Sequence, residues 1–127
     1  MAERDAELDP PRAMDVVEHP FDRVMSPPGS KSLTNRALIL AALSSGESVL
    51  HAPLVSQDTC ALRDALAALG AACRVTDDAW FIHGCDGHLP KGGRVNLGDG
   101  GTPTRFMLAA AALADKDVVV DGSARMR

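Results

Sequence analysis

Two alanine- and leucine-rich segments, each entered through a turn that contains glycine, restrict the folds open to this chain. Residues 33–43 follow a Pro-Pro-Gly turn at 27–29, and residues 103–113 follow a glycine-rich stretch at 98–102. Because proline removes a backbone donor and glycine admits positive φ, neither turn can continue a strand. Short apolar segments alternate with these helices. The order predicts an α/β domain with crossover helices and parallel strand pairs.

The predicted order of elements is β, α, β, α, β, β, then β, α, β. The segments expected to be extended are 16–24 (in two pieces broken by Pro20), 47–52, 71–76, 80–83, 95–97 and 116–121. Segments 71–76 and 80–83 are expected to form a hairpin. A middle helix should begin after Ser56 as N-cap, carry one stripe of leucines, and end at Gly70. The helices at 33–43 and 103–113 are apolar nearly all round, so we expect both to be buried.

The stretch from Ser26 to Arg36 predicts an anion site at the start of the first helix. Ser32 is expected to be the N-cap, with Lys31 beside it and Arg36 one turn further in. Free N–H groups at a helix start carry a partial charge of about +0.5. A cation, hydroxyls and a helix N-terminus at one turn suit a phosphate. The stretch is not a Walker A loop, because Met25 and Ser30 stand where that motif requires glycine.

The second glycine-rich turn, at 98–102, is expected to start a helix with Thr102 as N-cap and Pro103 at the first helical position. Two such turns would present two sets of backbone N–H groups, which strengthens the anion interpretation.

The composition favours a small anionic ligand over a nucleic acid. The net charge of −4 argues against a nucleic-acid partner, and an aromatic content of 3% without tyrosine argues against base stacking on aromatic platforms. Several cations instead fall at turns or helix starts, and these are Lys31, Arg36, Arg105, Arg125 and Arg127.

The cysteines indicate a reducing compartment, and we expect a cytoplasmic protein. Cys60, Cys73 and Cys85 are odd in number and form no CxxC pair. His83 and His88 flank Cys85, but no second ligand pair has zinc spacing, so no metal is expected.

The N-terminal residues 1–13 are polar and acidic and lack the apolar core of a signal peptide. We expect a disordered tail there, with Met14 as an alternative start. No segment reaches the roughly 18 apolar residues that a membrane span needs, so no membrane partner is expected.

Three blocks of residues resemble the EPSP synthase family of 3-phosphoshikimate 1-carboxyvinyltransferases. They are Pro28-Gly29-Ser30-Lys31-Ser32-x-x-Asn35-Arg36-Ala37-Leu38, Leu97-Gly98-x-x-Gly101-Thr102-x-x-Arg105 and Asp121-Gly122-x-x-Arg125-Met126. Residues 56–59 are also similar to the family's Ser-Asp-Asp-Thr segment. The blocks follow the family's order and spacing across residues 16–127.

The resemblance implies transfer of the carboxyvinyl group of phosphoenolpyruvate to the 5-hydroxyl of shikimate 3-phosphate, with release of phosphate, in the shikimate route to aromatic amino acids. It implies no metal or organic cofactor. The family fold has two globules built from βαβαββ units, with mixed sheets and buried helices. We therefore expect residues 14–127 to be part of the first globule, with one unit at about 22–93 and the next starting at 94–127.

By motif, the resemblance implies five substrate-binding residues. Lys31 would contact both substrates, Ser32 and Arg36 would hold shikimate 3-phosphate, and Gly101 (through its backbone) and Arg125 would bind phosphoenolpyruvate. Both substrates carry phosphate and carboxylate groups, which cations at helix starts can bind.

Four further residues bear on the resemblance. Arg105 matches a family arginine, and we expect it to brace the loop, whereas Arg127 is expected to be solvated. Asp99 stands where the family usually has Asn, which places a carboxylate near the expected phosphate unless it pairs with another group. Phe106 stands where the family usually has Pro, which puts sensitivity to the inhibitor glyphosate in question.

The family is considerably longer than this chain, and its second globule and acid/base groups are not among the 127 residues. The catalytic residues thus stay unassigned, and we expect these residues alone not to turn over substrate, while the complete protein is expected to be a monomer. One alternative is a non-catalytic, anion-binding remnant or regulatory relative. The other is the related UDP-N-acetylglucosamine carboxyvinyltransferase, whose motif has Asn where this chain has Ser32.

Overall fold

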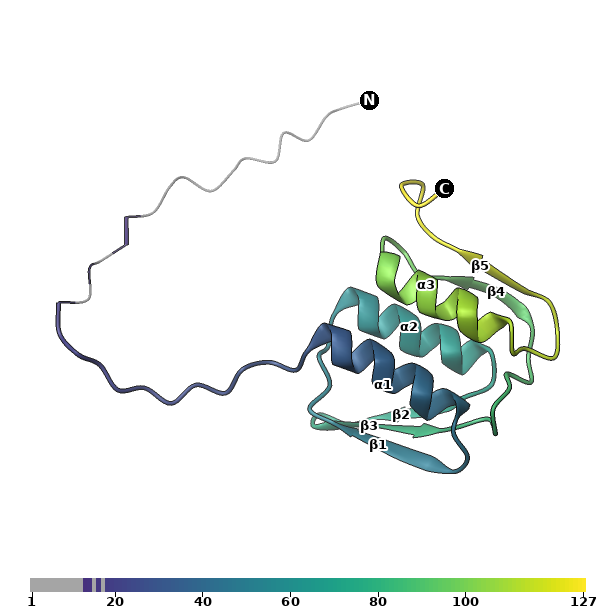
Figure 1. The fold of residues 1–127 in the computed structure, drawn as a ribbon, viewed down its shortest axis with the longest axis horizontal. Helices are drawn as coiled ribbons and strands as arrows, with labels where there is room; N and C mark the ends of the chain where they lie inside the picture. Colours follow the sequence, from purple (N-terminus) through teal and green to yellow (C-terminus); the bar gives the residue numbers. More distant parts are fainter. Residues whose placement is uncertain (1–12, 15, 17) are drawn as a thin grey trace.

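Three helices lie side by side between two small sheets (Figure 1) in the computed structural model, which describes residues 13, 14, 16 and 18–127. The helices are α1 (Lys31–Leu43), α2 (Gln57–Ala68) and α3 (Gly101–Ala111). The strands are β1 (Glu47–His51), β2 (Ala72–Val75), β3 (Ala79–His83), β4 (Gly93–Asn96) and β5 (Val118–Asp121).

The first sheet has the strand order β1-β3-β2, and both outer strands run antiparallel to β3. The outer strands are therefore parallel to each other, and α2 connects them. The predicted hairpin of β2 and β3 is confirmed. Along β3, Trp80 and Ile82 are buried while Phe81 between them is only partly covered, as expected for a strand with one face on the core.

The second sheet is a parallel pair, β4 and β5, joined by α3 as a crossover helix. This unit confirms the predicted combination of parallel strands with an antiparallel hairpin. Helix α2 contacts β2 of the first sheet and β4 of the second, so it joins the two halves of the domain.

The core lies where the helices meet each other and the sheets. Its largest fully buried side chains are Trp80, Leu38, Leu62, Leu66, Leu69, Ile82, Leu89, Leu97 and Met107. Leu62, Leu66 and Leu69 form the predicted stripe of α2, and Gly70 follows it with a φ of +128°.

The start of α1 differs from the prediction by two residues. Ser30, not Ser32, is the N-cap, and its Oγ accepts a hydrogen bond from the Leu33 N–H at 3.4 Å. The turn before it packs closely on the chain that follows β1, where a Cβ at Gly29 would lie 2.5 Å from the Ala52 carbonyl oxygen. The turn therefore ends at Gly29, and the residue after it becomes the cap. Lys31 is consequently the first residue of the helix.

The start of α3 also differs from the prediction. Gly100 is the N-cap, without any side-chain hydrogen bond, and the helix begins at Gly101 rather than at Pro103. Thr102 lies inside the first turn and is not the cap. By contrast, the predicted start of α2 is confirmed, because Ser56 and Thr59 form a reciprocal capping box.

The apolar helices are not buried all round, which corrects a second expectation. In α1, Leu33 and Leu40 are 69% and 71% exposed, while Leu38 is buried. The sheets and neighbouring helices cover only the inner side of the helix layer. Leu108 of α3 is exposed on its outer side as well.

The expected extended pieces at 16–24 are wrong for the residues that are described, since residues 18–30 contain no strand. This segment leads away from the helices (Figure 1), and none of the described strands pairs with its backbone. The expected disordered tail, apart from Ala13, lies outside the described residues. Within those residues, no helix combines the length and apolar character that crossing a membrane requires.

A buried leucine and an exposed leucine provide a test of this core. We expect Leu62→Ala to lower the free energy of unfolding by about 2–5 kcal/mol, because it leaves a cavity between α2 and its neighbours. Leu40→Ala, on the exposed side of α1, should change it by less than about 0.5 kcal/mol. Urea unfolding followed by circular dichroism measures both, and equal effects would contradict the described packing.

Candidate functional site

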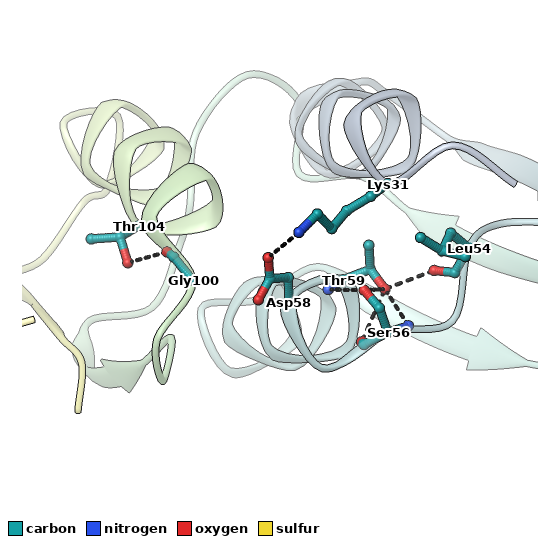
Figure 2. Close-up of polar contacts among 7 residues, drawn as sticks. All are labelled: Lys31, Leu54, Ser56, Asp58, Thr59, Gly100 and Thr104. Carbon is teal, nitrogen blue, oxygen red and sulfur yellow. Dashed lines mark hydrogen bonds and ion pairs between the residues drawn. The ribbon is translucent and has the colours of Figure 1, made fainter. Parts of the chain in front are cut away.

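The first turns of all three helices lie at the same end of the helix layer (Figures 1 and 2). We call this end, marked by Lys31, Gln57 and Gly101, the N-terminal edge. Two contacts establish its alignment. Lys31 of α1 forms an ion pair with Asp58 of α2, and Arg36 of α1 lies over the ring of Phe106 in α3. Arg36 and Phe106 each lie five residues after the start of their own helix.

The helix N-termini make the N-terminal edge electropositive. Each helix leaves its first N–H groups without intrahelical partners, and the partial charges of three neighbouring helices add at one end. Among the three, α2 alone carries an acidic residue in its first turn, and this residue is Asp58. An anion placed at this edge would therefore meet backbone donors from more than one helix.

Lys31 extends from the start of α1 toward α2 (Figure 2). Its Nζ is 3.0 Å from Asp58 Oδ2, and its side chain remains 54% exposed. An ammonium group has three donors, so this ion pair leaves two for a ligand. The sequence prediction does not include Asp58 in the site, and the family-like segment at 56–59 is the available signal.

Hydrogen bonds of Thr59 hold the first turn of α2, which carries Asp58. Thr59 Oγ1 accepts from the Ser56 N–H at 2.9 Å and donates to the Leu54 carbonyl at 2.7 Å, and Thr59 is fully buried. Such a satisfied buried hydroxyl fixes the first turn of α2 relative to the loop before it. Asp58 is therefore presented from a rigid support.

Ser32 and Arg36 lie together on α1. Arg36 Nη1 donates to the Ser32 carbonyl oxygen at 3.0 Å and also contacts the Ser32 hydroxyl. The Arg36 guanidinium lies 5.5 Å from the centre of the Phe106 ring of α3. Both Ser32 and Arg36 are exposed, so the structure brings this predicted pair together and leaves its outer edge open.

Gly101 offers its backbone at the start of α3. A Cβ there would meet nothing within 4 Å, whereas a Cβ at the preceding Gly100 would overlap the ring of Pro103. The two glycines thus differ: Gly100 is required by packing, and Gly101 has open space beside it, as a residue that receives a ligand through its backbone needs.

Asp99 is tied to the C-terminal turn, by which we mean residues 122–127. Its carboxylate accepts a hydrogen bond from the Ser123 hydroxyl, and the Ser123 N–H donates to the Gly98 carbonyl at 2.9 Å. The carboxylate that stands in place of the family's usual Asn therefore has a partner of its own. These bonds also hold the C-terminal turn against the start of α3.

Asp121 organises the same region from the end of β5. Its carboxylate accepts two hydrogen bonds from Arg127, at 2.8 and 2.9 Å. It also accepts one from Arg94 at 2.9 Å and one from the Gly122 N–H at 2.8 Å. The hydrogen bond from Arg127 is the largest of the influences that lower the pKa of Asp121 to about 2, followed by the bond from Gly122. The Arg127 side chain stays 64% exposed, as predicted for a solvated cation, and it also forms an ion pair with Asp121 that the sequence did not predict.

Arg125 is exposed in the C-terminal turn. Within residues 18–127, no hydrogen bond or ion pair joins it to Lys31, Ser32 or Arg36, whose contacts go to Asp58, to Phe106 and to one another. The structure therefore does not bring Arg125 into direct contact with the predicted residues of α1.

Arg105 is exposed on α3, and the described residues offer its side chain no hydrogen bond or ion pair. The expectation that it braces the loop is wrong. The loop is held instead by the bonds between Ser123 and residues 98–99.

The Asp121 cluster predicts a pH dependence of stability. Because the pKa of Asp121 is lowered from 3.8 to about 2 in the folded state, its ion pairs stabilise the fold above pH 4 and lose their effect as the pH falls through 2. Urea unfolding of the wild type and Asp121→Asn should differ at pH 6, and the difference should shrink between pH 4 and pH 2. Asp77→Asn, in the exposed β2–β3 turn, controls for the loss of one negative charge. A difference of unchanged size at pH 2 would contradict the cluster.

Comparison with known proteins places the chain in a family. A family model described as EPSP synthase (3-phosphoshikimate 1-carboxyvinyltransferase) matches residues 19–127. The 3-phosphoshikimate 1-carboxyvinyltransferase of Rhizobium etli is 51% identical over 102 residues, which cover 80% of this chain and 24% of the relative. That of Pseudomonas savastanoi pv. phaseolicola is 45% identical over 112 residues, which cover 87% of this chain and 27% of the relative.

The chain spans about a quarter of the length of these curated relatives. Among solved structures, EPSP synthase from Acinetobacter baumannii matches with a TM-score of 0.70 and 24% identity, over 76% of this chain and 23% of that one. This likeness confirms the predicted fold class. Because the family model covers most of the chain and the relatives share up to 51% of its residues over the matched part, the chain belongs to the EPSP synthase family.

Proposed function

We propose that this chain supplies the substrate-binding N-terminal part of a 3-phosphoshikimate 1-carboxyvinyltransferase, which joins phosphoenolpyruvate to shikimate 3-phosphate and releases phosphate. The observation that carries the proposal is the N-terminal edge, where three helix starts lie together with Lys31 among them. Each of the two substrates bears a phosphate and a carboxylate, and these groups match backbone donors and cations.

Lys31 is proposed to contact both substrates. It is the first residue of α1, and its ammonium group lies between α1 and α2, with Asp58 as its fixed partner. A cation at a helix N-terminus is unfavourable to the helix itself, because it meets the positive end of the dipole. Binding of an anion would relieve this repulsion, which supports a role for Lys31 in function rather than in stability.

Ser32 and Arg36 are proposed to hold shikimate 3-phosphate. Arg36 uses Nη1 for its bonds to Ser32, which leaves the donors of Nε and Nη2 for a carboxylate or phosphate. Gly101, through its backbone N–H, and Arg125 are proposed to bind phosphoenolpyruvate. The bonds between Ser123 and the 98–99 loop support this pairing, since they hold the C-terminal turn beside the start of α3.

The remaining parts of the reaction are assigned to residues outside these 127. We propose that the acid/base groups come from the part of the enzyme that the chain does not span, and that residues 14–127 contribute one unit at about 22–93 and the start of the next. A cytoplasmic, monomeric complete enzyme without metal or organic cofactor is part of the same proposal.

Titration calorimetry with shikimate 3-phosphate tests the binding role. We expect the chain to bind, and Lys31→Ala or Arg36→Ala to weaken binding by about tenfold or more, because each removes a charge-assisted hydrogen bond worth roughly 1.5–3 kcal/mol. Arg74→Ala is the matched control, since Arg74 stacks on Phe81, which alternates with the buried Trp80 and Ile82 and so lies on the face of the first sheet opposite the core. Absence of binding by the wild type would favour a structural remnant, and equal affinities would contradict the assigned residues.

Turnover provides a separate test. When the chain is mixed with both substrates, we expect no release of inorganic phosphate above the uncatalysed background, because the acid/base groups are assigned elsewhere. The complete Rhizobium etli relative serves as the positive control for the assay. Phosphate release by the purified 127-residue chain would overturn this division of the enzyme.

A further inference from the structure

Phe106 contacts Arg36 from the neighbouring helix. Its ring centre lies 5.5 Å from the Arg36 guanidinium, within the distance at which a cation is attracted to an aromatic face. The two residues occupy equivalent positions in α1 and α3, five residues after each helix begins. The contact therefore spans the gap between two helices whose starts form the N-terminal edge.

The guanidinium is held on two sides. On the side of α1, Nη1 donates to the Ser32 carbonyl at 3.0 Å. On the side of α3 lies the Phe106 ring. Arg36 and Phe106, with Ile39 and Leu40, line an apolar cavity of about 270 Å³. Arg36 is thus fixed at the border between this apolar surface and the electropositive edge.

An arginine in a cation–π contact can keep its N–H donors available for a ligand. The hydrogen bonds of Arg36 use Nη1, so the N–H groups of Nε and Nη2 are left to bind a planar carboxylate or a phosphate. An arginine held only by its own helix would lose more side-chain entropy on binding a ligand, because a long side chain must then be ordered at that moment. The contact with Phe106 orders the Arg36 side chain beforehand.

We propose that Phe106 is a positioning residue, which orients Arg36 for the anionic substrate through the cation–π contact between its ring and the Arg36 guanidinium. This inference rests on the proposed function, because it assigns to Arg36 a ligand at the N-terminal edge. Phe106 does not touch the ligand in this proposal; it acts through Arg36 alone.

The chain offers a matched control. Arg74 lies 3.7 Å from the centre of the Phe81 ring, on the face of the first sheet opposite the core. Phe81→Leu therefore removes the same chemical group from the same kind of pair outside the site. Phe106→Tyr retains an aromatic face, and Phe106→Met replaces Phe106→Leu if the leucine variant does not fold.

The experiment is titration calorimetry of the 127-residue chain with shikimate 3-phosphate, with thermal unfolding measured alongside. We expect Phe106→Leu to weaken binding by about two- to fivefold, the range expected for an exposed cation–π contact. Phe106→Tyr and Phe81→Leu should bind as the wild type does. In an Arg36→Gln background, titrated at higher ligand concentration, Phe106→Leu should cause no further loss, because the stacked cation is already gone.

Three outcomes would overturn the inference, and they are distinguishable. Wild-type affinity in Phe106→Leu overturns the positioning role alone and leaves the proposed function standing. An equal loss in the Arg36→Gln background shows that Phe106 acts through packing and not through Arg36. Failure of the wild type to bind overturns the proposed function and this role together.

Discussion

The ion pair between Lys31 and Asp58 joins two helices at the ends where their dipoles repel. Parallel helices packed side by side bring like partial charges together, and a lysine in the first turn adds to the positive charge. Asp58 offsets part of this charge from the first turn of α2. The remaining charge is what an anionic ligand would neutralise, so an arrangement that is unfavourable to the helices themselves is also what suits the edge to bind.

The connections of the chain place the starts of two helices. Along the chain, helix α2 connects the parallel outer strands β1 and β2, and α3 connects the parallel strands β4 and β5. A crossover helix between parallel strands runs opposite to them, so it begins where the preceding strand ends. The starts of α2 and α3 consequently lie near the ends of β1 and β4. In open α/β folds, ligands bind at the carboxyl ends of the strands for the same reason.

Much of this fold can be predicted from the sequence, and the failures have physical causes. The boundaries of α2 follow from Ser56, the leucine stripe and Gly70, because all three indicate the same helix. The starts of the other two helices do not follow from such local signals. Each start lies beside a tight backbone contact that helix propensity does not predict. Gly29 packs against the chain after β1, and Gly100 packs against the ring of Pro103.

Side-chain pairings are the other cause of error. Arg127 pairs with Asp121 and Asp99 with Ser123, and neither partner is identifiable from spacing alone. The burial of Asn35 is a separate case, since an amide in the first turns of a helix is ordinarily exposed, whereas this one is fully buried. The motif residues themselves do lie at turns and helix starts, as predicted, because glycine and proline mark such positions locally.

The pairing of the carboxylates explains how a chain with a net charge of −4 can present a site for anions. Asp58 is paired with Lys31, and Asp121 with Arg94 and Arg127. Asp99 is held by the Ser123 hydroxyl. Each of these carboxylates is thus directed toward a partner of the protein's own, while Arg36 keeps donors free. Since screening weakens distant charges, a ligand at this edge responds to these neighbours more than to the net charge.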